Sequence, residues 1–349
     1  MQTRQQPGPG ASKKTITLHR AARIDDAWLD WRARRGRKRG LVATVIPYTG
    51  YGSTTLVRVL ARVLLTKPDA TPAAAPAQRV RGWRSFTSIP VVSASVTINA
   101  GEESFDVIAD RGGVIDAEIS VSLDPGWQQI TLRSEGSRPV VTNIFIADPD
   151  VQVGVISDID DTVMVTALPR PLLAAWNTFV LDEHARTPVP GMAVLLERVA
   201  RRHEGTPIIY LSTGAWNVAP TLSRFLRRHL YPTGALLLTD WGPTHDRLFR
   251  SGRQHKADNL RRLAAEFPDI RWLLVGDNGQ HDEEIYGAFA EEYPNNVAAV
   301  AIRQLSVPEA VLAGGRSKGE EPAKTTTTPW IYAPDGAGLL EQLEELGLV

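Results

Sequence analysis

Two different hydrophobic patterns divide the chain. Between residue 41 and about residue 148, short runs of alternating apolar and polar residues are separated by turns, which is typical of antiparallel β-sheets. The alternation is clearest in SFDVIAD and AEISVSL, at residues 104–110 and 117–123. Strands are expected at residues 41–52, 54–65, 90–101, 102–113, 114–123, 128–134 and 139–148. The pattern predicts a β-rich, sandwich-like domain over residues 41–150.

From residue 151 onward the apolar runs become continuous and alternate with segments of helical periodicity. This pattern favours a parallel sheet covered by helices. Buried strands are expected at residues 151–156, 206–214, 235–242, 271–279 and 297–305. Helices are expected at residues 171–184, 192–204, 218–229, 255–267, 281–294 and 336–348. Residues 151–349 therefore predict an α/β domain, with a mobile loop at about residues 314–328.

The first forty residues carry an unusual charge. They contain eleven Lys or Arg residues and three Asp residues, a net charge of +8 in a chain whose overall net charge is zero. A polar tail precedes apolar positions between Leu18 and Trp31 that predict an amphipathic helix. This helix either docks on the neighbouring domain, with a solvated basic end, or lies on anionic lipid. Nucleic acid is not expected, because the basic run is short and holds few aromatic residues for base stacking.

The composition limits the cellular compartment that we expect and the kinds of catalytic or metal site that the chain can form. The 349 residues suffice for two or three domains, and the chain contains no cysteine. A disulfide framework, a thiolate metal site and a cysteine nucleophile are therefore excluded. The chain shows no run of 18 apolar residues and no apolar core near its start. We expect a cytoplasmic protein that reaches lipid, if at all, as a peripheral protein at the inner membrane face.

Three aspartates, Asp158, Asp160 and Asp161, follow the strand at residues 151–156 almost directly. Like charges at this spacing repel, and buried carboxylates need a cation to hold them. Open α/β sheets place ligand sites at the carboxyl ends of their parallel strands. The cluster therefore predicts a site for a divalent cation and a phosphoryl group; the alternative is an acidic turn that caps the next helix.

Further candidates follow the later strands: Ser212, Lys256, Asp277 and Asp282. Phosphoryl transfer needs a nucleophile, a proton donor, a divalent cation and donors to the phosphoryl oxygens. Carboxylate oxygens suit Mg²⁺, and a carboxylate nucleophile gives an acyl-phosphate. Alternatives remain for each residue. Ser212 could cap a turn, Lys256 could be exposed while Arg253 takes its role, and Asp282 could be a helix N-cap.

These motifs resemble those of the haloacid dehalogenase-like phosphatases. The match consists of DIDDT at residues 158–162, Ser212 after a strand, Lys256 on a helix and GDNGQHD at residues 276–282. VISDIDDTV, YLSTGAWN and GDNGQHDEEIY resemble, more closely, the catalytic domain of the actin-patch-type phosphatidate phosphatases, a group akin to the lipins. The resemblance implies a Rossmannoid parallel-sheet fold, and the region before it resembles the β-rich domain that precedes the catalytic domain in that family.

The resemblance also implies residue roles. Asp158 would be the nucleophile, and Asp160 would protonate the leaving alkoxide and then activate water. Ser212 would bind a phosphoryl oxygen, and Lys256 would offset negative charge.

The implied Mg²⁺ ligands are Asp158, Asp160 and Asp277, with Thr162 and Asp282 as structural support. Gly214 and Asn217 are candidates for substrate binding. Trp216 is expected to pack in the core, and neither His245 nor His255 is expected to bind metal.

The spacing of the motifs bears on the substrate. Thr162 lies 50 residues before Ser212, which lies 44 residues before Lys256, and the expected helices and strand fill both intervals. Little or no cap domain is therefore expected, and an open site could meet a phosphate presented at a membrane surface. The resemblance implies conversion of phosphatidate to diacylglycerol. The alternatives are the same chemistry on a soluble, nucleic-acid or protein phosphomonoester, and a non-catalytic β-sandwich interaction protein with a silent phosphatase fold.

Overall fold

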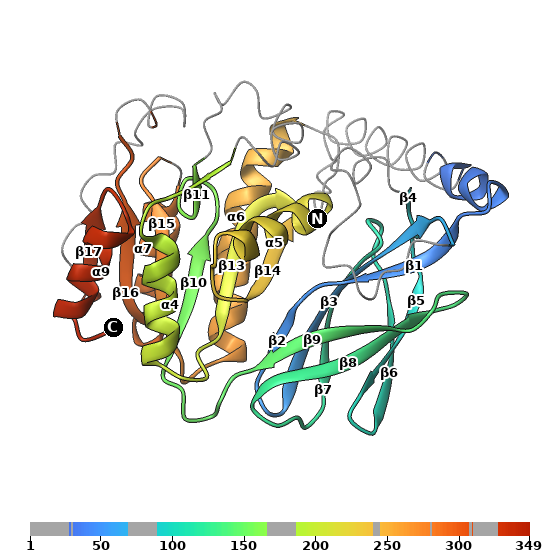
Figure 1. Cartoon of the computed structure of the whole chain (residues 1–349), viewed down its shortest axis with the longest axis horizontal. Helices are drawn as coiled ribbons and strands as arrows, with labels where there is room; N and C mark the ends of the chain where they lie inside the picture. Colours follow the sequence, from blue (N-terminus) through green and yellow to red (C-terminus); the bar gives the residue numbers. More distant parts are fainter. Residues whose placement is uncertain are drawn as a thin grey trace, which may run out of the picture.

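The structure, a computed structural model, contains two large β-sheets that lie side by side (Figure 1) and a small two-stranded sheet. It describes residues 28, 31–68, 89–165, 186–239, 245–279, 281–306, 309 and 327–349. Several predicted segments lie outside the described residues: the tail and most of the helix before residue 31, the helix at 171–184, and the greater part of the loop at 314–328.

The first sheet has nine strands and is mostly antiparallel. Its strands are β1 (Val42–Pro47), β2 (Gly50–Gly52), β3 (Leu56–Thr66), β4 (Ile89–Pro90), β5 (Ser95–Ala100), β6 (Glu103–Ile108), β7 (Val114–Ser120), β8 (Gly126–Ser134) and β9 (Val140–Ile146). The main order is β1-β3-β2-β9-β8-β5-β6, and the long strand β3 also pairs with β7 and β4 along its other edge. β2 and β9 pair in parallel, which the alternation pattern alone did not predict.

The second sheet has six strands, and every neighbouring pair is parallel. Its strands are β10 (Val153–Asp158), β13 (Ile208–Ala215), β14 (Ala235–Thr239), β15 (Arg271–Asp277), β16 (Val297–Arg303) and β17 (Trp330–Ala333). The helices described around it are α4 (Met192–Arg202), α5 (Ala219–Arg228), α6 (His245–Glu266), α7 (Asp282–Glu292) and α9 (Gly336–Glu345). The predicted fold class, a parallel α/β sheet preceded by a β-rich domain, is confirmed.

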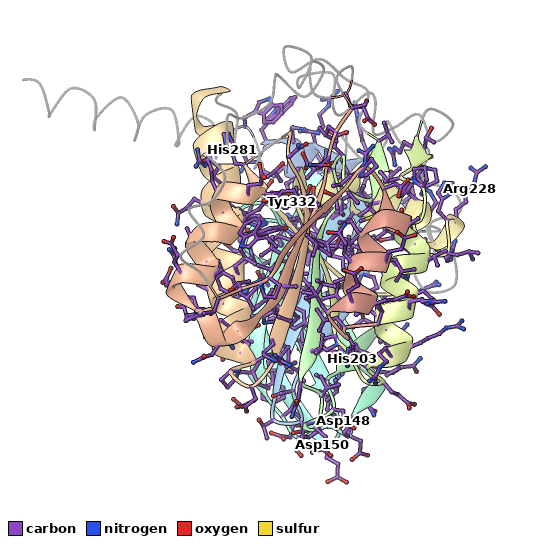
Figure 2. All side chains as sticks on the ribbon, turned by 90° about the vertical axis from the view of Figure 1, so that its left-hand side faces the viewer. Asp148, Asp150, His203, Arg228, His281 and Tyr332 are labelled. Atoms are coloured by element: carbon purple, nitrogen blue, oxygen red, sulfur yellow. The ribbon has the colours of Figure 1, made fainter. Side chains whose placement is uncertain are left out.

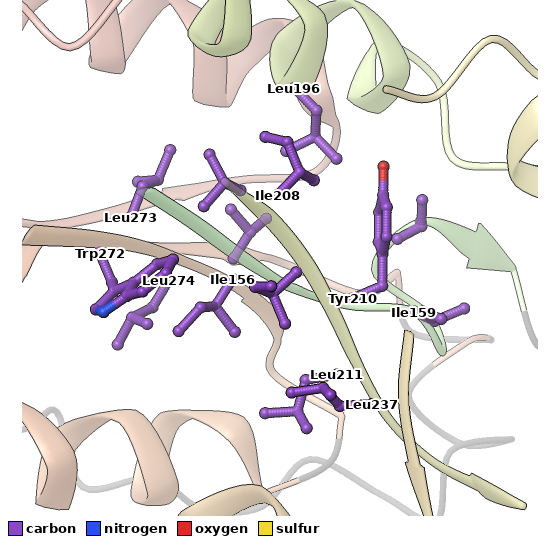
Figure 3. Packing of buried hydrophobic residues seen from close by; sticks show 14 of the residues in the cluster. Ile156, Ile159, Leu196, Ile208, Tyr210, Leu211, Leu237, Trp272, Leu273 and Leu274 are labelled. Carbon is purple, nitrogen blue, oxygen red and sulfur yellow. The ribbon is translucent and has the colours of Figure 1, made fainter. Parts of the chain in front are cut away.

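Burial on both faces explains the continuous apolar runs of the parallel sheet. All six residues of β10 are buried. Figure 3 shows Leu273 on the side of the strands that faces Leu196 of α4, while Trp272 lies toward the helices of the other face. Gly154 permits this packing, since a Cβ atom there would lie 2.4 Å from Cζ3 of Trp272.

Strand order places a crevice beside β10. The order is β14-β13-β10-β15-β16-β17, so the chain moves from β10 to β14 in one direction and then continues from β15 on the other side of β10. Such a reversal leaves a crevice at the carboxyl ends of the two strands where it occurs. The last residues of those strands are Asp158 and Asp277.

Some elements differ from the sequence prediction. The strand expected at 41–52 is split into β1 and β2, and α6 begins at His245 rather than at residue 255. The sixth strand, β17, was not predicted, because only four residues lie between Pro329 and Pro334. A short hairpin of β11 (Met164–Val165) and β12 (Thr187–Pro188) was also missed.

Residues 31–38 form a helix that is only partly covered. Ala33 packs against the β-rich core, and Gly36 is buried where a Cβ atom would lie 3.1 Å from side chains of Leu65 and Ile89. Trp28 and Trp31 remain 50% and 52% exposed. One side of the helix therefore docks, as one of the two interpretations predicted. Among the described residues, no helix has the length and apolar character to cross a membrane.

Candidate active site

A buried lysine joins two of the predicted carboxylates. Lys256 of α6 is 2% exposed, and its Nζ lies 2.8 Å from Oδ1 of Asp158 and 2.5 Å from Oδ1 of Asp282. Burial alone would lower the pKa of Lys256, but the two carboxylates raise that pKa well above its usual value. Lys256 is therefore a permanent cation at the end of β10.

Asp277 completes the group from the neighbouring strand. Oxygens of Asp158, Asp277 and Asp282 all lie within 4.8 Å of one another. The backbone N–H of Asp277 donates to Oδ2 of Asp282 at 3.4 Å. Gly276 allows this approach, because a Cβ atom there would lie 2.7 Å from that same oxygen. The GDNGQHD motif thus brings two carboxylates together by means of a glycine between strand and turn.

Asp160 contacts Ser212, which lies in the neighbouring strand β13. Ser212 Oγ donates a hydrogen bond of 3.1 Å to Oδ2 of Asp160 and accepts one of 3.0 Å from the N–H of Gly214. Burial, and next the charge of Asp161, raises the pKa of Asp160 to about 7. A carboxyl group with this pKa can both donate and accept a proton near neutral pH.

The cluster contains more carboxyl groups than basic groups. Burial raises the pKa of both Asp158 and Asp277 well above the usual value; Lys256 opposes the shift, and neighbouring aspartates add to it. Five aspartates are buried here: Asp158, Asp160, Asp161, Asp277 and Asp282. An excess of buried carboxylates over cations is unfavourable unless a further cation binds.

The donor set fits a divalent metal ion. Oδ2 of Asp158 and Oδ1 of Asp160 are buried and have no hydrogen-bond partner among the described residues. Hard carboxylate oxygens of this kind suit Mg²⁺, which binds one or two carboxylates and keeps several waters. Asp158, Asp277 and Asp282 could hold a metal, and their oxygens alone do not specify which one.

The site lies at one end of the parallel sheet. Figure 2 shows His281, the residue before α7, toward the upper end of the sheet, and His203, Asp148 and Asp150 at the lower end. Asp158 and Asp277 end their strands at the carboxyl edge, as the parallel topology predicted.

Several open alternatives are resolved by the side-chain positions. Lys256 contacts Asp158, while Arg253 forms an exposed ion pair with Glu284. The N-cap position of α7 is His281, so the carboxylate of Asp282 is directed to Lys256 instead. Trp216 is buried, as expected for core packing. Ser212 Oγ accepts from the N–H of Gly214 and donates to Asp160, and its expected contact with a phosphoryl oxygen stays a prediction.

The other residues considered in the sequence analysis are Thr162, Gly214, Asn217, His255 and His245. Thr162 is fully buried, its hydroxyl has no hydrogen-bond partner among the described residues, and its role as structural support stays a prediction. Gly214 uses its N–H on Ser212, and Asn217 is half-buried in the short helix η2 (Trp216–Val218). His255 is bonded to Asn259 and lies outside the metal-binding group, whereas the side chain of His245 lies outside the described part of the chain.

Sequence reasoning missed two residues that hold the loop after β10, at residues 159–163. Arg303, the buried last residue of β16, donates from Nη1 to the carbonyl of Asp161 at 2.7 Å. Asp161 has a φ of +58°, so its left-handed backbone needs such support. The hydroxyl of Tyr231 donates to the carbonyl of Val163 at 2.7 Å. The available signal was an arginine at the end of the apolar run VAAVAIR.

Comparison with known proteins agrees with this geometry. Residues 153–304 match the family model described as "Phosphatidate phosphatase APP1, catalytic domain". Phosphatidate phosphatase APP1 of Saccharomyces cerevisiae is 24% identical over 210 residues, which cover 58% of this chain and 35% of that protein. An uncharacterized protein of Schizosaccharomyces pombe is 26% identical over 155 residues, covering 44% of this chain and 25% of that protein.

The chain thus spans about a third or less of the length of the curated relatives that it matches. Among solved structures, a carbohydrate acetylesterase from Xanthomonas citri covers 78% of this chain and 73% of its own. Its TM-score is 0.28 and its identity 9%, so it informs neither fold nor function.

The matched residues include the strands β10, β13, β14, β15 and β16 and all members of the carboxylate–lysine cluster. The match over residues 153–304 is to the family that the motifs resemble, that of the APP1 phosphatidate phosphatase catalytic domain.

Proposed function

We propose that the chain is a Mg²⁺-dependent phosphatase that hydrolyses phosphatidate to diacylglycerol through an aspartyl-phosphate. The observation that carries the proposal is the buried contact of Lys256 with Asp158 at the end of β10, beside Asp277 and Asp282. The family match over residues 153–304 supports the lipid substrate.

In the first half of the reaction, a carboxylate oxygen of Asp158 attacks phosphorus and displaces the diacylglycerol oxygen. Lys256 holds the attacking carboxylate in place and offsets the negative charge that gathers around it. Asp160, in its protonated form, gives its proton to the leaving oxygen. Its pKa of about 7 keeps a large fraction of the group protonated at neutral pH.

In the second half, Asp160 is a carboxylate and accepts a proton from the water that attacks the aspartyl-phosphate. The P–O bond to Asp158 breaks, phosphate leaves, and both aspartates return to their starting state. Ser212 Oγ, which contacts Asp160 in this structure, orients that carboxyl group and binds a phosphoryl oxygen. Asp158, Asp277 and Asp282 would hold the Mg²⁺, with Asp160 as a further ligand. The ion supplies positive charge for the phosphoryl oxygens.

The substrate would be reached from a membrane surface. Trp28 and Trp31 are half exposed, and Arg32 and Arg35 lie over their rings at 4.5 and 5.7 Å. Exposed tryptophans beside arginines are typical of helices that lie on anionic lipid, where each basic residue contributes about 1 kcal/mol. Peripheral attachment at the cytoplasmic face is therefore part of the proposal.

The substrate assignment is tested by phosphate release from phosphatidate in mixed micelles with Mg²⁺. Wild type should be active, Asp158→Asn should lose at least about a thousandfold in rate, and Asp150→Asn, at the opposite end of the sheet (Figure 2), should keep full activity. Release from an aryl phosphate but not from phosphatidate would keep the phosphatase chemistry and point to a soluble, nucleic-acid or protein phosphomonoester. Inactivity on both would favour a non-catalytic interaction protein.

Membrane attachment is tested separately by co-sedimentation with anionic and neutral vesicles. Replacing both Trp28 and Trp31 with Ala should release the protein from anionic vesicles without changing activity on a soluble aryl phosphate. Unchanged sedimentation of this variant would remove the helix from the proposal.

A further inference from the structure

The two sheets contact each other next to the candidate active site. Tyr48, between β1 and β2, stacks on Trp216, with ring centroids 4.9 Å apart and an interplanar angle of 25°. The Tyr48 hydroxyl also lies 3.5 Å from the Trp216 carbonyl oxygen. Tyr48 is 9% and Trp216 is 4% exposed, so the contact is buried.

Trp216 lies four residues after Ser212, in the turn that leaves β13. The inner side of that turn is fixed by hydrogen bonds: Ser212 Oγ accepts from Gly214, and Thr239 Oγ1 donates to the carbonyl of Thr213 at 3.0 Å. Tyr48 covers the turn at Trp216, from the other sheet. The position of the Gly214 N–H and of Asn217 therefore depends on contacts from both sheets.

Tyr48 is itself held firmly by the β-rich sheet. Its N–H donates to the carbonyl of Leu60 at 3.0 Å, and its carbonyl accepts from Thr142 Oγ1 at 2.8 Å. Its backbone is therefore held on both sides by the β-rich sheet. A tyrosine on an unsupported loop could not hold Trp216 in a fixed position.

A second contact between the sheets lies away from the site. Tyr51 of β2 packs against Phe267, at 6.0 Å between centroids, just beyond the end of α6. Lys256 lies roughly 15 Å from there along the helix axis, at 1.5 Å per residue. Tyr48 and Tyr51 thus offer a matched pair: both are buried tyrosines from one sheet, and only Tyr48 contacts the active-site turn.

We infer that Tyr48 is a positioning residue for the active site: its ring holds residues 212–217, where β13 ends and η2 begins, so that the N-terminal sheet is part of the catalytic unit. The inference rests on the proposed phosphatase function for its kinetic consequence only. Its structural consequence, the fixed position of the turn, is independent of the substrate.

The test compares Tyr48→Leu with Tyr51→Leu in the full chain. Kinetics on a soluble aryl phosphate with Mg²⁺ should show kcat/KM lowered about tenfold or more for Tyr48→Leu, because small displacements of positioning groups cost up to about a hundredfold. Tyr51→Leu should stay within about twofold of wild type at temperatures where it is folded. Tyr48→Phe, which keeps the ring, should restore nearly full activity.

Hydrogen exchange supplies the second measurement. The amides of residues 213–217 should exchange faster in Tyr48→Leu and stay protected in Tyr51→Leu. If wild type releases no phosphate from any substrate, the proposed function fails, but this comparison still decides whether Tyr48 holds the turn. If Tyr48→Leu does not fold, Tyr48→Met takes its place. Equal effects of the two tyrosine variants, or unchanged exchange and activity in a folded Tyr48 variant, would overturn the inference.

Discussion

Among the described residues, the most buried ion pair between the β-rich sheet and the helices of the parallel sheet joins Arg58 to Glu266, and it gives a quantitative test of how the two parts are held together. Arg58 of β3 donates from Nε to Oε1 of Glu266 on α6 at 2.7 Å, and the two side chains are 9% and 4% exposed. Arg58 also reaches Asp116 and Glu118, whose side chains are 35% and 49% exposed. The buried partner is therefore Glu266, and the other two carboxylates remain partly hydrated.

Replacing Arg58 with Met should lower the free energy of unfolding by about 3 to 5 kcal/mol, because Glu266 would stay buried without its cation. The nearest remaining cation is Arg262, whose Nε lies 4.0 Å from Oε1 of Glu266, too far for a hydrogen bond. Asp116 and Glu118 should contribute at most about 1 kcal/mol each, as exposed pairs do. Urea unfolding followed by circular dichroism measures the total loss in the free energy of unfolding.

Two control variants separate the effect of burying an unpaired charge from the effect of removing a charge at the surface. Arg201→Met removes an exposed pair with Glu197, with side chains 79% and 40% exposed, and should cost about 0.5 kcal/mol or less. The double variant Arg58→Met/Glu266→Leu removes both buried charges and should regain most of the lost stability. If Arg58→Met lowers the free energy of unfolding no more than Arg201→Met does, or if the double variant is less stable than Arg58→Met, burial of Glu266 does not cause the loss of stability.

Three further changes test other parts of the structure. Arg303→Met should lower kcat about tenfold or more while the protein stays folded, because the carbonyl of Asp161 loses its hydrogen-bond donor. Arg303→Lys should recover part of the rate. Equal kcat values in wild type and both variants would contradict a supporting role of Arg303. Burial lowers the pKa of His255 to about 4 from a usual value near 6.5, so the unfolded chain binds the proton first and stability should fall by about 3 kcal/mol between pH 6.5 and 4. His255→Gln should flatten that part of the urea-stability profile, and an unchanged slope would show that other groups cause it. Gly154→Ala should destabilise by about 1 to 3 kcal/mol, since its methyl group would overlap Trp272, and a neutral effect in urea unfolding would contradict the packing.

Much of the parallel sheet could be predicted because its signal is local. A run such as Val153–Asp158 is apolar throughout most of its length and ends in a carboxylate, which marks both a buried strand and its functional end. The same holds for Arg271–Asp277 after its first residue. Because parallel strands bring their carboxyl ends to one edge, the sequence alone suffices to place Asp158 and Asp277 together.

The supporting contacts could not be predicted, because they join distant parts of the chain. Tyr48 and Trp216 are 168 residues apart, and Arg303 and Asp161 are 142 apart. Neither Tyr48 nor Arg303 belongs to a motif, and each acts through a position that only the tertiary fold creates. β17 escaped prediction for a related reason: its four residues gain their strand character from pairing with β16.

The most direct test of the account is to trap the phosphoenzyme. Wild-type protein would be mixed with Mg²⁺ and phosphatidate labelled in its phosphate, quenched in acid during turnover, and digested for mass spectrometry. We expect one added phosphoryl group on the peptide that contains Asp158, labile to hydroxylamine, and none in Asp158→Asn. Turnover with no labelled peptide in any quench, label on a different residue, or undiminished turnover by Asp158→Asn would contradict the assignment of Asp158 as the nucleophile.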